Sequence, residues 1–591
     1  MSKLNSKTTS ISKIEFLNEH FKLPIYYNAN KMDLKNEIKD DLELIKTIDN
    51  DSIPMLEYAF QPKNILGKKV LQQFANNYTT DTEHLKDTQN LLKNYKNIDG
   101  EIFAPDYNNI VGIWNDIKND NGFKERYRYI EWPMWEFLNK NESFLQIMSI
   151  YDLSSPILSL LTPIIILIIP FFVLKVKGMK TNWSEYIEIL KKIISTQPLG
   201  RLFTQFNSVK MDQKIYLILS AAFYLFTIYQ NILSCMRFHN NMHKIHSQIN
   251  DLKVYIKHSL ASMKNYLNYS SSLKSYNEFN ENVRNNIKVI EEIEKKLDKI
   301  TPWEFSFSKI GQLGNVQKYF YELYCDENYN NAIMYSLGFN GYIDNITGII
   351  ENINDKKINL VKFSSKNKEN KKLNKNYFKN AYYPALINNN PVKNTYKFKK
   401  NMIITGPNAS GKTTNLKSAL INVFISQQMG CGFYESAYLI PYKYIHCYLN
   451  IPDTSGRDSL FQAEARRCKE IIDIIDENKK ETHFCAFDEL YSGTNPDEAV
   501  MSANAFMEYL IKNTNVTCIL TTHFIKLCNY LDKNKNVENY HMKTKKDDTT
   551  SDFTYLYKLE KGISNIRGGI KVLSDMNYPK EILENTKNFD L

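Results

Sequence analysis

The chain has 591 residues, a formal net charge of +10 and 8 cysteines. This length exceeds what a single hydrophobic core holds, so about three or four domains are expected. The cysteines include no Cys-x-x-Cys pair, which argues against a zinc site or a disulfide framework and favours a reducing compartment. The positive charge suits a nucleic-acid partner, yet lysine is abundant throughout the chain, so charge alone leaves that partner open.

The first 152 residues are predicted to be mainly helical. Residues 1–51 are polar and weakly periodic, which indicates a short helical lead, and their start lacks the apolar core of a cleavable signal. Residues 52–152 are predicted to form the first part of a helical core. The apolar side chains that repeat there at helical spacing are Met55, Leu56, Phe60, Ile65, Leu66, Val70, Leu71 and Phe74.

Residues 153–236 are predicted to form a membrane-associated hairpin. Two uncharged apolar segments, 153–174 and 215–236, each have the length of about 20 residues that spans a bilayer. The alternative is that both are buried helices of a large soluble domain. The loop between them is rich in lysine, and within it residues 183–194 have the pattern of an amphipathic helix. Such a helix suits a membrane surface or packing against protein equally well.

Residues 237–363 are predicted to be the second part of the helical core, including a long lever. Its apolar positions recur at steps of three and four, which is typical of an amphipathic helix or a short coiled coil. These positions are Ile245, Ile249, Leu252, Ile256, Leu260 and Met263. A charged, linker-like run at 366–376 then leads to the last domain, residues 376–591.

This last domain opens with a phosphate-binding loop. The apolar strand 402–405 runs into the pattern Gly-x-x-x-x-Gly-Lys-Thr, whose glycines let backbone N–H groups face phosphates at the start of a helix. Lys412 is expected to reach the β- and γ-phosphates of ATP, and Thr413 to bind Mg²⁺. The predicted cofactor-binding residues are Gly406, Pro407, Asn408, Ala409, Ser410, Gly411, Lys412, Thr413 and Thr414.

Two further apolar strands end in chemically useful residues. Residues 482–489 end in Asp488, predicted to be the second Mg²⁺ ligand, and in Glu489, the predicted catalytic base. Residues 516–522 lead to His523, a candidate γ-phosphate sensor whose alternative role is structural. Between them and the loop, Ser459 opens a helix that it can cap. Residues 492–498 form a turn that leads into another helix.

Four sequence blocks occur in a diagnostic order: GPNASGKTT at 406–414, SLFQAE at 459–464, FDELYSGTNPDEA at 487–499 and TTHF at 521–524. Together they resemble the ATPase domain of the MutS mismatch-repair family, whose ATPases are related to those of ABC transporters. The likeness continues through 539–542 and 562–582, which resemble the last strands and the helix-turn-helix that clasps the partner subunit in that family. The fold class is therefore expected to be multidomain: a mostly helical amino-terminal and lever region with membrane segments, then a carboxyl-terminal α/β P-loop NTPase domain.

The resemblance also implies roles for individual residues. It implies a homodimer through the ATPase domains, in which Ser459 reaches the γ-phosphate of the opposite subunit as a third catalytic residue. Here the sequence departs from the family, because Arg457 replaces the usual glycine and Gly456 lies one step earlier. The segments 383–384 and 391–394 resemble those that pack near the adenine. Gly67 resembles a family glycine that lets two helices approach.

The resemblance does not extend to mismatch reading. A mismatch-sensing MutS protein carries an amino-terminal domain that wedges a phenylalanine between bases, and this sequence has no room for it before Ser52. The similar-looking Phe433-Tyr434-Glu435 lies inside the ATPase domain and is rejected as a reader.

Two functions are compatible with these features. The first is a dimeric, membrane-anchored ATPase clamp whose levers grip DNA, as in mismatch repair or recombination. The alternative is a membrane-anchored ATPase switch or scaffold without nucleic acid. We expect membrane association with the ATPase domain in the cytoplasm, and a soluble intracellular protein as second choice. The lysine-rich loop conflicts with a simple hairpin, because the positive-inside rule would keep both the loop and the ATPase in the cytoplasm. Either the rule is broken or one segment re-enters the membrane.

Overall fold

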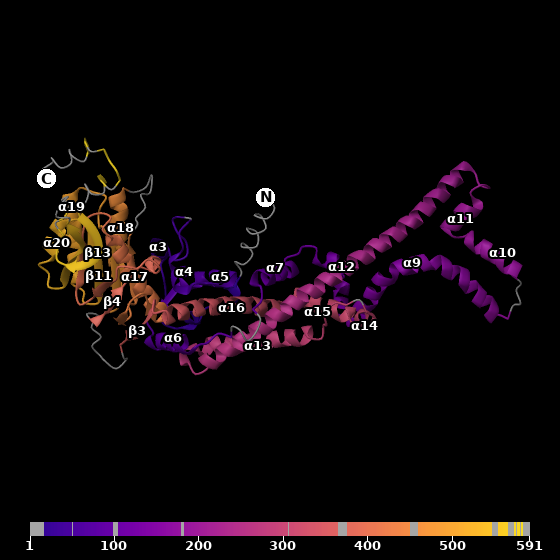
Figure 1. The fold of residues 1–591 in the computed structure, drawn as a ribbon, viewed down its shortest axis with the longest axis horizontal. Helices are drawn as coiled ribbons and strands as arrows, with labels where there is room; N and C mark the ends of the chain where they lie inside the picture. Colours follow the sequence, from indigo (N-terminus) through magenta and orange to yellow (C-terminus); the bar gives the residue numbers. More distant parts are fainter. Residues whose placement is uncertain are drawn as a thin grey trace. The chain divides into compact units, whose positions relative to one another are not determined.

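The computed structural model describes residues 17–49, 51–98, 104–178, 183–304, 306–364, 375–449, 459–546 and 553–564, with a few further residues up to Ile582 (Figure 1). The chain divides into two compact units. The first unit contains residues 1–101, 261–287 and 333–591, and the second contains 102–260 and 288–332. These two units do not coincide with the domains predicted from the sequence, and the predicted domain boundaries stay predictions. The predicted hairpin, residues 153–236, lies wholly within the second unit.

The first unit is built on a six-stranded sheet with the strand order β13-β12-β6-β11-β10-β9. Five strands are parallel: β9 (Tyr444–Tyr448), β10 (His483–Asp488), β11 (Val516–Thr522), β6 (Asn401–Thr405) and β12 (Val537–Lys546). The edge strand β13 (Phe553–Lys561) runs antiparallel to β12. β6 and β11 are buried along their whole length, as expected for parallel strands covered on both faces. Their carboxyl ends therefore meet at one edge of the sheet.

Four helices accompany this sheet: α17 (Lys412–Met429), α18 (Leu460–Glu477), α19 (Pro496–Ile511) and α20 (Ile525–Leu531). All but α17 contribute to a core with β10 and β11 that includes Cys485, Phe487, Cys518 and Leu520. α17 is buried along nearly all of its length. Its neighbours include β4 and β7 of a five-stranded sheet of order β5-β4-β8-β3-β7. These strands are β5 (Asn394–Lys397), β4 (Tyr377–Ala381), β8 (Ser436–Leu439), β3 (Asn359–Phe363) and β7 (Cys431–Gly432), with the short helix η5 (Pro384–Leu386) after β4.

The helical part of the first unit is tightly packed at two glycines. A Cβ atom on Gly348 would lie 1.7 Å from the carbonyl oxygen of Phe60, and one on Gly67 would lie 2.1 Å from Asp344 Oδ2. The predicted close approach at Gly67 is therefore present, and only glycine leaves room for it. The elements involved are α4 (Met55–Phe60), α5 (Ile65–Phe74) and α16 (Glu327–Asn354). The first unit also contains β2 (Asn77–Thr79), α6 (Thr82–Asn94), η3 (Lys274–Tyr276) and the first part of α13 (Asn277–Leu297).

The stretch predicted as a polar lead contributes to this core. Among residues 17–49 the structure has α2 (Leu17–His20), η1 (Pro24–Tyr27), β1 (Lys31–Asp33) and α3 (Asn36–Asp41), and β1 pairs with β2. Phe21, Ile38 and Leu42 are 0–1% exposed. The sequence did not predict this burial, because the elements here are only a few residues long and none is long enough to show a periodic apolar pattern.

The second unit is helical. It contains α7 (Tyr107–Lys118), α8 (Phe123–Tyr127), η2 (Pro133–Lys140), α9 (Glu142–Val176), α10 (Trp183–Ile194), α11 (Pro198–Gln205), most of α12 (Met211–Ser270), α14 (Phe307–Ile310) and α15 (Leu313–Cys325). The Phe123 ring stacks on Tyr324 with centroids 4.1 Å apart. Gly314 donates its N–H to Gln146 Oε1 at 2.8 Å, so α15 lies directly on the first turns of α9. The predicted stripe on α12 is buried, from Ile245 at 0% to Leu260 at 4% exposure.

Both predicted apolar segments are helical, in α9 and α12. In the described part of the chain, two helices are long and apolar enough to cross a membrane, Glu142–Thr162 and Met211–Ser270. Within the most apolar 18 residues of each helix, only 17% and 11% of the residues are buried. Tyr224 and Asn231 of α12 donate to the carbonyl oxygen and Oγ of Ser159 in α9, at 3.2 and 3.3 Å. In Figure 1 both helices lead away from α14 and α15 to α10 and α11. α12 is unbroken, so the second segment shows no re-entrant turn.

Three predicted features lie outside the described residues. They are most of the linker at 366–376, the Gly456-Arg457 departure, and nearly all of the carboxyl-terminal helix-turn-helix.

Candidate active site

The phosphate-binding loop connects β6 to α17. β6 ends at Thr405, and Gly411 is the residue before the first turn of α17, with a φ angle of 89°. Ala409 also has a positive φ angle, 62°. These left-handed residues curl the loop, and glycine is favoured at such positions because it has no Cβ to clash. As at any helix start, the first N–H groups of α17 have no partner further back in the helix and favour an anion.

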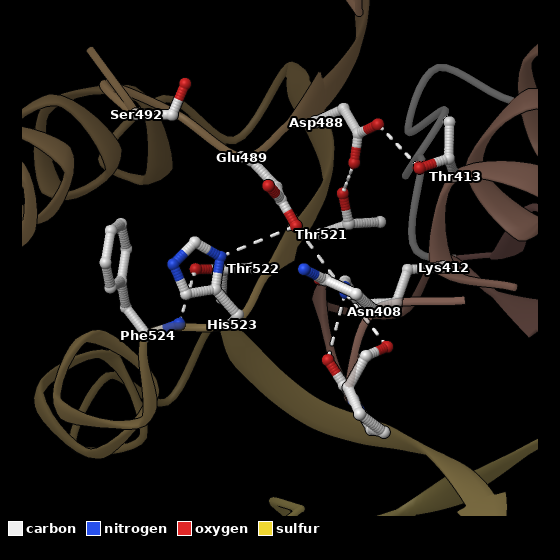
Figure 2. Close-up of polar contacts among 12 residues, drawn as sticks. Asn408, Lys412, Thr413, Asp488, Glu489, Ser492, Thr521, Thr522, His523 and Phe524 are labelled. Atoms are coloured by element: carbon white, nitrogen blue, oxygen red, sulfur yellow. Dashed lines mark hydrogen bonds and ion pairs between the residues drawn. The ribbon is translucent and has the colours of Figure 1, made fainter. Parts of the chain in front are cut away.

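Lys412 lies at the centre of the site. Its side chain is only 5% exposed. The ammonium donates to the carbonyl oxygens of Gly406 at 3.0 Å and Pro407 at 3.2 Å, and lies 3.5 Å from Glu489 Oε1 (Figure 2). A buried cation needs such oxygen partners. Phosphate oxygens can take the place of these carbonyls.

Thr413 and Asp488 lie together, although they are distant in sequence. Thr413 Oγ1 donates to Asp488 Oδ2 at 2.7 Å, and Thr521 donates to the other carboxylate oxygen (Figure 2). Burial raises the pKa of Asp488, and the two threonine hydrogen bonds oppose that rise. A hydroxyl and a carboxylate side by side are oxygen ligands of the kind that Mg²⁺ prefers.

Glu489 and His523 form the next pair. His523 Nδ1 lies 3.5 Å from Glu489 Oε1, and the two side chains are 46% and 33% exposed (Figure 2). The hydrogen bond from His523 lowers the pKa of Glu489, and the charge of Lys412 lowers it further. The carboxylate is thus ionised near neutral pH, as a general base must be. Glu489 also has a φ angle of 48°, a strained conformation that is common at functional sites.

A cavity of about 820 Å³ joins these residues to an aromatic wall. Its size is within the range of small-molecule sites. Lys412 and Thr413 line it together with the aromatic side chains. The cavity thus offers apolar surface to a base and polar groups to phosphates. Lining residues outside the phosphate loop include Tyr382, Tyr383, Pro391, Val392, Asn394, Asp488, Glu489 and Tyr557.

Of the segments 383–384 and 391–394, predicted to lie near the adenine, Tyr383, Pro391, Val392 and Asn394 line this cavity. Tyr557 was not predicted. It reaches the site because Asn394 donates to its carbonyl oxygen at 3.0 Å. A Cβ on Gly411 would lie 3.0 Å from the Tyr557 ring.

Sequence reasoning also missed Glu464, which shapes the turn after Glu489. Its side chain is almost fully buried. It accepts hydrogen bonds from the N–H and Oγ of Ser492, at 3.1 and 2.9 Å, and from the N–H of Gly493, at 3.2 Å. The available signal was a carboxylate on the otherwise buried face of a predicted helix, because such a group needs several donors.

Ser459 is at a helix start, as predicted. Its Oγ accepts from the N–H of Gln462 at 3.3 Å, and Gln462 Oε1 accepts from the N–H of Ser459 at 2.9 Å. This reciprocal pair is a capping box. Ser459 is exposed, and its recorded hydrogen bonds stay within α18. The structure therefore accounts for the capping role, while a role towards another subunit stays a prediction.

The parallel sheet, the phosphate loop and the acidic strand end define a P-loop ATPase. Residues 402–590 match the family model for MutS domain V. The carboxyl-terminal region is thus a MutS-type ATPase domain, of a kind that binds ATP and Mg²⁺.

Curated relatives match about a third of the chain. One is the DNA mismatch repair protein MSH3 of Meyerozyma guilliermondii, 30% identical over 208 residues, which are 34% of this chain and 21% of that protein. Another is the endonuclease MutS2 of Helicobacter pylori, 30% identical over 215 residues, 36% of this chain and 26% of that protein. The human MutS protein homolog 4 is 31% identical over 195 residues, 32% of this chain and 20% of that protein. The chain therefore matches about a quarter or less of these relatives, and is a distant homologue.

Proposed function

We propose that the protein is an ATP-driven clamp that works as a homodimer through its ATPase domains. The observation that carries this proposal is the exposure of Glu489, which lines the cavity, and of His523 beside it. ATP hydrolysis at a defined base requires that bulk water be kept out. A second subunit would supply the missing wall, and the exposed Ser459 at the start of α18 is the residue proposed to reach its phosphate.

The proposed roles follow the contacts of each side chain. Lys412 neutralises the β- and γ-phosphates, and Thr413 with Asp488 holds Mg²⁺. That ion supplies charge neutralisation at the phosphates. Glu489 is the proposed acceptor of the proton of the attacking water, and the low pKa that His523 gives it keeps its carboxylate ionised for that role. His523 orients Glu489 and senses the γ-phosphate.

DNA is the proposed object of the clamp. Two of the relatives reported above carry names that connect them with DNA mismatch repair or nuclease action, and the net charge of +10 favours phosphate binding. The 60-residue helix α12 is the proposed lever. Direct mismatch reading is not part of the proposal, since Phe433 and Tyr434 are buried at 0% and 1% exposure.

Binding to duplex, branched and single-stranded DNA at increasing salt tests this part. The logarithm of the binding constant should fall linearly with the logarithm of salt concentration, because bound phosphates release counterions. Lys412→Ala should bind DNA without an ATP-dependent change. Absence of binding to all three DNA forms at low salt would remove DNA from the account.

The hairpin formed by residues 153–174 of α9 and 215–236 of α12 is the proposed membrane anchor. Its support is the exposure of apolar side chains that would otherwise face water, such as Ile157 at 59% and Phe223 at 71%. Polar groups inside it are satisfied locally: Thr162 and Thr227 donate to carbonyl oxygens one turn earlier, as a bilayer requires. The proposed location is a membrane, with the ATPase domain in the cytoplasm where ATP is available.

Flotation and fractionation of the full chain test the anchor. The protein should sediment with membranes and be released by detergent but not by high salt. A protein that stays soluble without detergent would refute the anchor and favour the soluble intracellular alternative.

The exposed hairpin also supports a second candidate, an ATPase switch or scaffold at a membrane that does not bind nucleic acid. The two candidates differ in what stimulates hydrolysis. ATP turnover that responds to vesicles and not to DNA favours the switch, whereas turnover that responds to DNA favours the clamp.

A further inference from the structure

Two buried asparagines lie beside the ATP cavity and bind each other. Asn394 begins β5 and is 3% exposed, and Asn415 lies in the first turn of α17 and is 7% exposed. Asn394 Nδ2 donates to Asn415 Oδ1 at 2.9 Å. We call these two residues the amide pair. Buried amides need partners for their polar atoms, so the other contacts of the amide pair show what it holds in place.

The first of these contacts is with the phosphate-binding loop. Asn415 Nδ2 donates to the carbonyl oxygen of Gly411 at 3.0 Å, and the main-chain N–H of Asn415 donates to the same oxygen at 3.0 Å. In a planar trans peptide, the C=O and the N–H point in opposite directions. Holding the Gly411 carbonyl towards α17 therefore aims the N–H of Lys412 out of the helix end, where an anion binds.

The second contact is with the aromatic wall of the cavity. Asn394 Nδ2 also donates to the carbonyl oxygen of Tyr557 at 3.0 Å, and Asn394 Oδ1 accepts from the N–H of Leu559 at 2.9 Å. The amide pair thus joins the phosphate-binding loop to β13, although the two are distant in sequence.

Tyr557 lies in a bulge of β13. Met542 pairs with Leu559 and Thr544 pairs with Tyr555, so a single residue of β12 faces three residues of β13. Tyr557 is the middle one of these three and has a φ angle of 54°. A bulge leaves its extra residues outside the ladder and redirects their side chains. The hydrogen bond from the amide pair therefore holds this bulge where Tyr557 lines the cavity.

The amide pair has one defined orientation. The hydroxyl of Tyr396, which is 1% exposed, donates to Asn415 Oδ1 at 2.9 Å. Asn415 Oδ1 thus accepts two hydrogen bonds while Asn415 Nδ2 donates, and turning this amide over would set donors against donors. A buried network whose members are all satisfied specifies one arrangement. The phosphate-binding loop and the aromatic wall are therefore held in a fixed relation to each other.

We propose that Asn415 is a positioning residue for ATP binding, which acts through the peptide between Gly411 and Lys412, and that Asn394 extends this control to the Tyr557 wall. Asn415 places a main-chain donor for the phosphates, and Asn394 places an apolar ring for the base. The proposal rests on ATP binding at the phosphate-binding loop. It is independent of the proposed dimer, DNA partner and membrane anchor.

Equilibrium binding of two probes to the full-length protein separates the two halves of the site. Mg²⁺-ATP contacts both halves, whereas Mg²⁺-tripolyphosphate has no base and reports on the phosphate half alone. Each probe competes with a fluorescent ATP analogue, and steady-state kinetics and thermal unfolding are measured on the same variants. Asn345→Ala is the matched control. Asn345 is fully buried in α16, likewise donates to a carbonyl oxygen one turn earlier, that of Gly341, at 2.8 Å, and does not line the cavity.

Asn415→Ala should weaken the binding of both probes by the same factor of about ten, because the Gly411 carbonyl loses a buried donor. KM should rise while kcat at saturating ATP stays within about twofold of wild type. Asn394→Ala should weaken ATP binding and leave tripolyphosphate binding nearly unchanged. Asn415→Ser should restore binding, since a helical serine can donate to the carbonyl oxygen one turn earlier. Asn345→Ala should be less stable and bind both probes like the wild type.

Wild-type affinity for both probes in Asn415→Ala overturns the positioning role. Equal weakening in Asn345→Ala also overturns it, because the loss would then follow from stability alone. If Asn415→Ala does not fold, Asn415→Ser decides: near wild-type tripolyphosphate binding supports the proposal, and binding about tenfold weaker overturns it. Equal weakening of both probes in Asn394→Ala, or of neither, overturns the link to Tyr557. A wild-type protein that binds neither probe overturns the ATP site itself.

Discussion

The buried carboxylate of Glu464 gives a direct test of how the active-site turn is positioned. In Glu464→Ala, the Ser492 N–H, the Ser492 hydroxyl and the Gly493 N–H all lose their acceptor. Hydrogen bonds to a charged acceptor contribute about 1.5–3 kcal/mol each. Ser492 and Gly493 are exposed, so water can replace some of the lost hydrogen bonds. The free energy of unfolding should therefore fall by about 2–4 kcal/mol. Glu464→Gln keeps one acceptor oxygen and should lose about 1–2 kcal/mol.

The turn that Glu464 holds directly follows Glu489, so loss of these hydrogen bonds should displace Glu489 and slow ATP hydrolysis. We expect kcat to fall about tenfold or more in Glu464→Ala, since 1.4 kcal/mol corresponds to a factor of ten. Nucleotide affinity should change little, because Lys412 and Thr413 are untouched. Steady-state ATPase kinetics, fluorescent-nucleotide binding and thermal unfolding separate these effects. Wild-type kcat in a destabilised Glu464→Ala protein would refute the positioning role.

Three further outcomes are expected. Glu489→Gln should slow hydrolysis by about two orders of magnitude or more while ATP still binds, because only the base is lost; Glu508→Gln, on the exposed side of α19, is its control, and normal turnover in Glu489→Gln would contradict the assignment. Burial raises the pKa of Asp488, so on acidification this carboxylate should be protonated at a higher pH than an ordinary aspartate, and Mg²⁺ binding should weaken with it. That protonation is favoured in the folded state, so thermal stability should not fall over the same pH window; a Mg²⁺ affinity independent of pH would argue against the site. Gly348→Ala should destabilise the fold by about 2–3 kcal/mol through overpacking, since its Cβ would lie 1.7 Å from a backbone oxygen of α4. Gly112→Ala is the control: its Cβ would meet nothing within 4 Å, so this change should be neutral or slightly stabilising in the same unfolding assay.

The sequence predicted those features that depend on local pattern. The apolar run 402–405 followed by Gly406 predicted a strand and a phosphate loop, and the structure has β6 and the start of α17 there. The run 516–522 coincides with β11. Asp488 and His523 could be placed near the loop because the carboxyl ends of parallel strands share one edge.

The features that sequence missed depend on tertiary contacts. Tyr557 reaches the cavity through a hydrogen bond from Asn394, 163 residues away in sequence. Glu464 looks like any acidic residue on a helix until its burial is known.

The membrane hairpin shows a further limit. The sequence predicted its two apolar helices, and the structure has both in one unit. What surrounds them is a property of the environment, so the anchor stays a proposal. The lysines at the far end, such as Lys175 and Lys177, still conflict with the positive-inside rule for an unbroken hairpin.

The central claim is that each ATP site is completed by a second copy of the chain. Its most direct test is the ATPase activity of mixed dimers made from Ser459→Ala and Lys412→Ala subunits, each inactive alone. If Ser459 acts across the interface, one site of the heterodimer carries both defects and the other carries neither, so mixing should restore up to one working site per dimer. Lys469→Ala, an exposed change on α18, should be active alone and serves as the control. Heterodimers that form and remain inactive would contradict the claim.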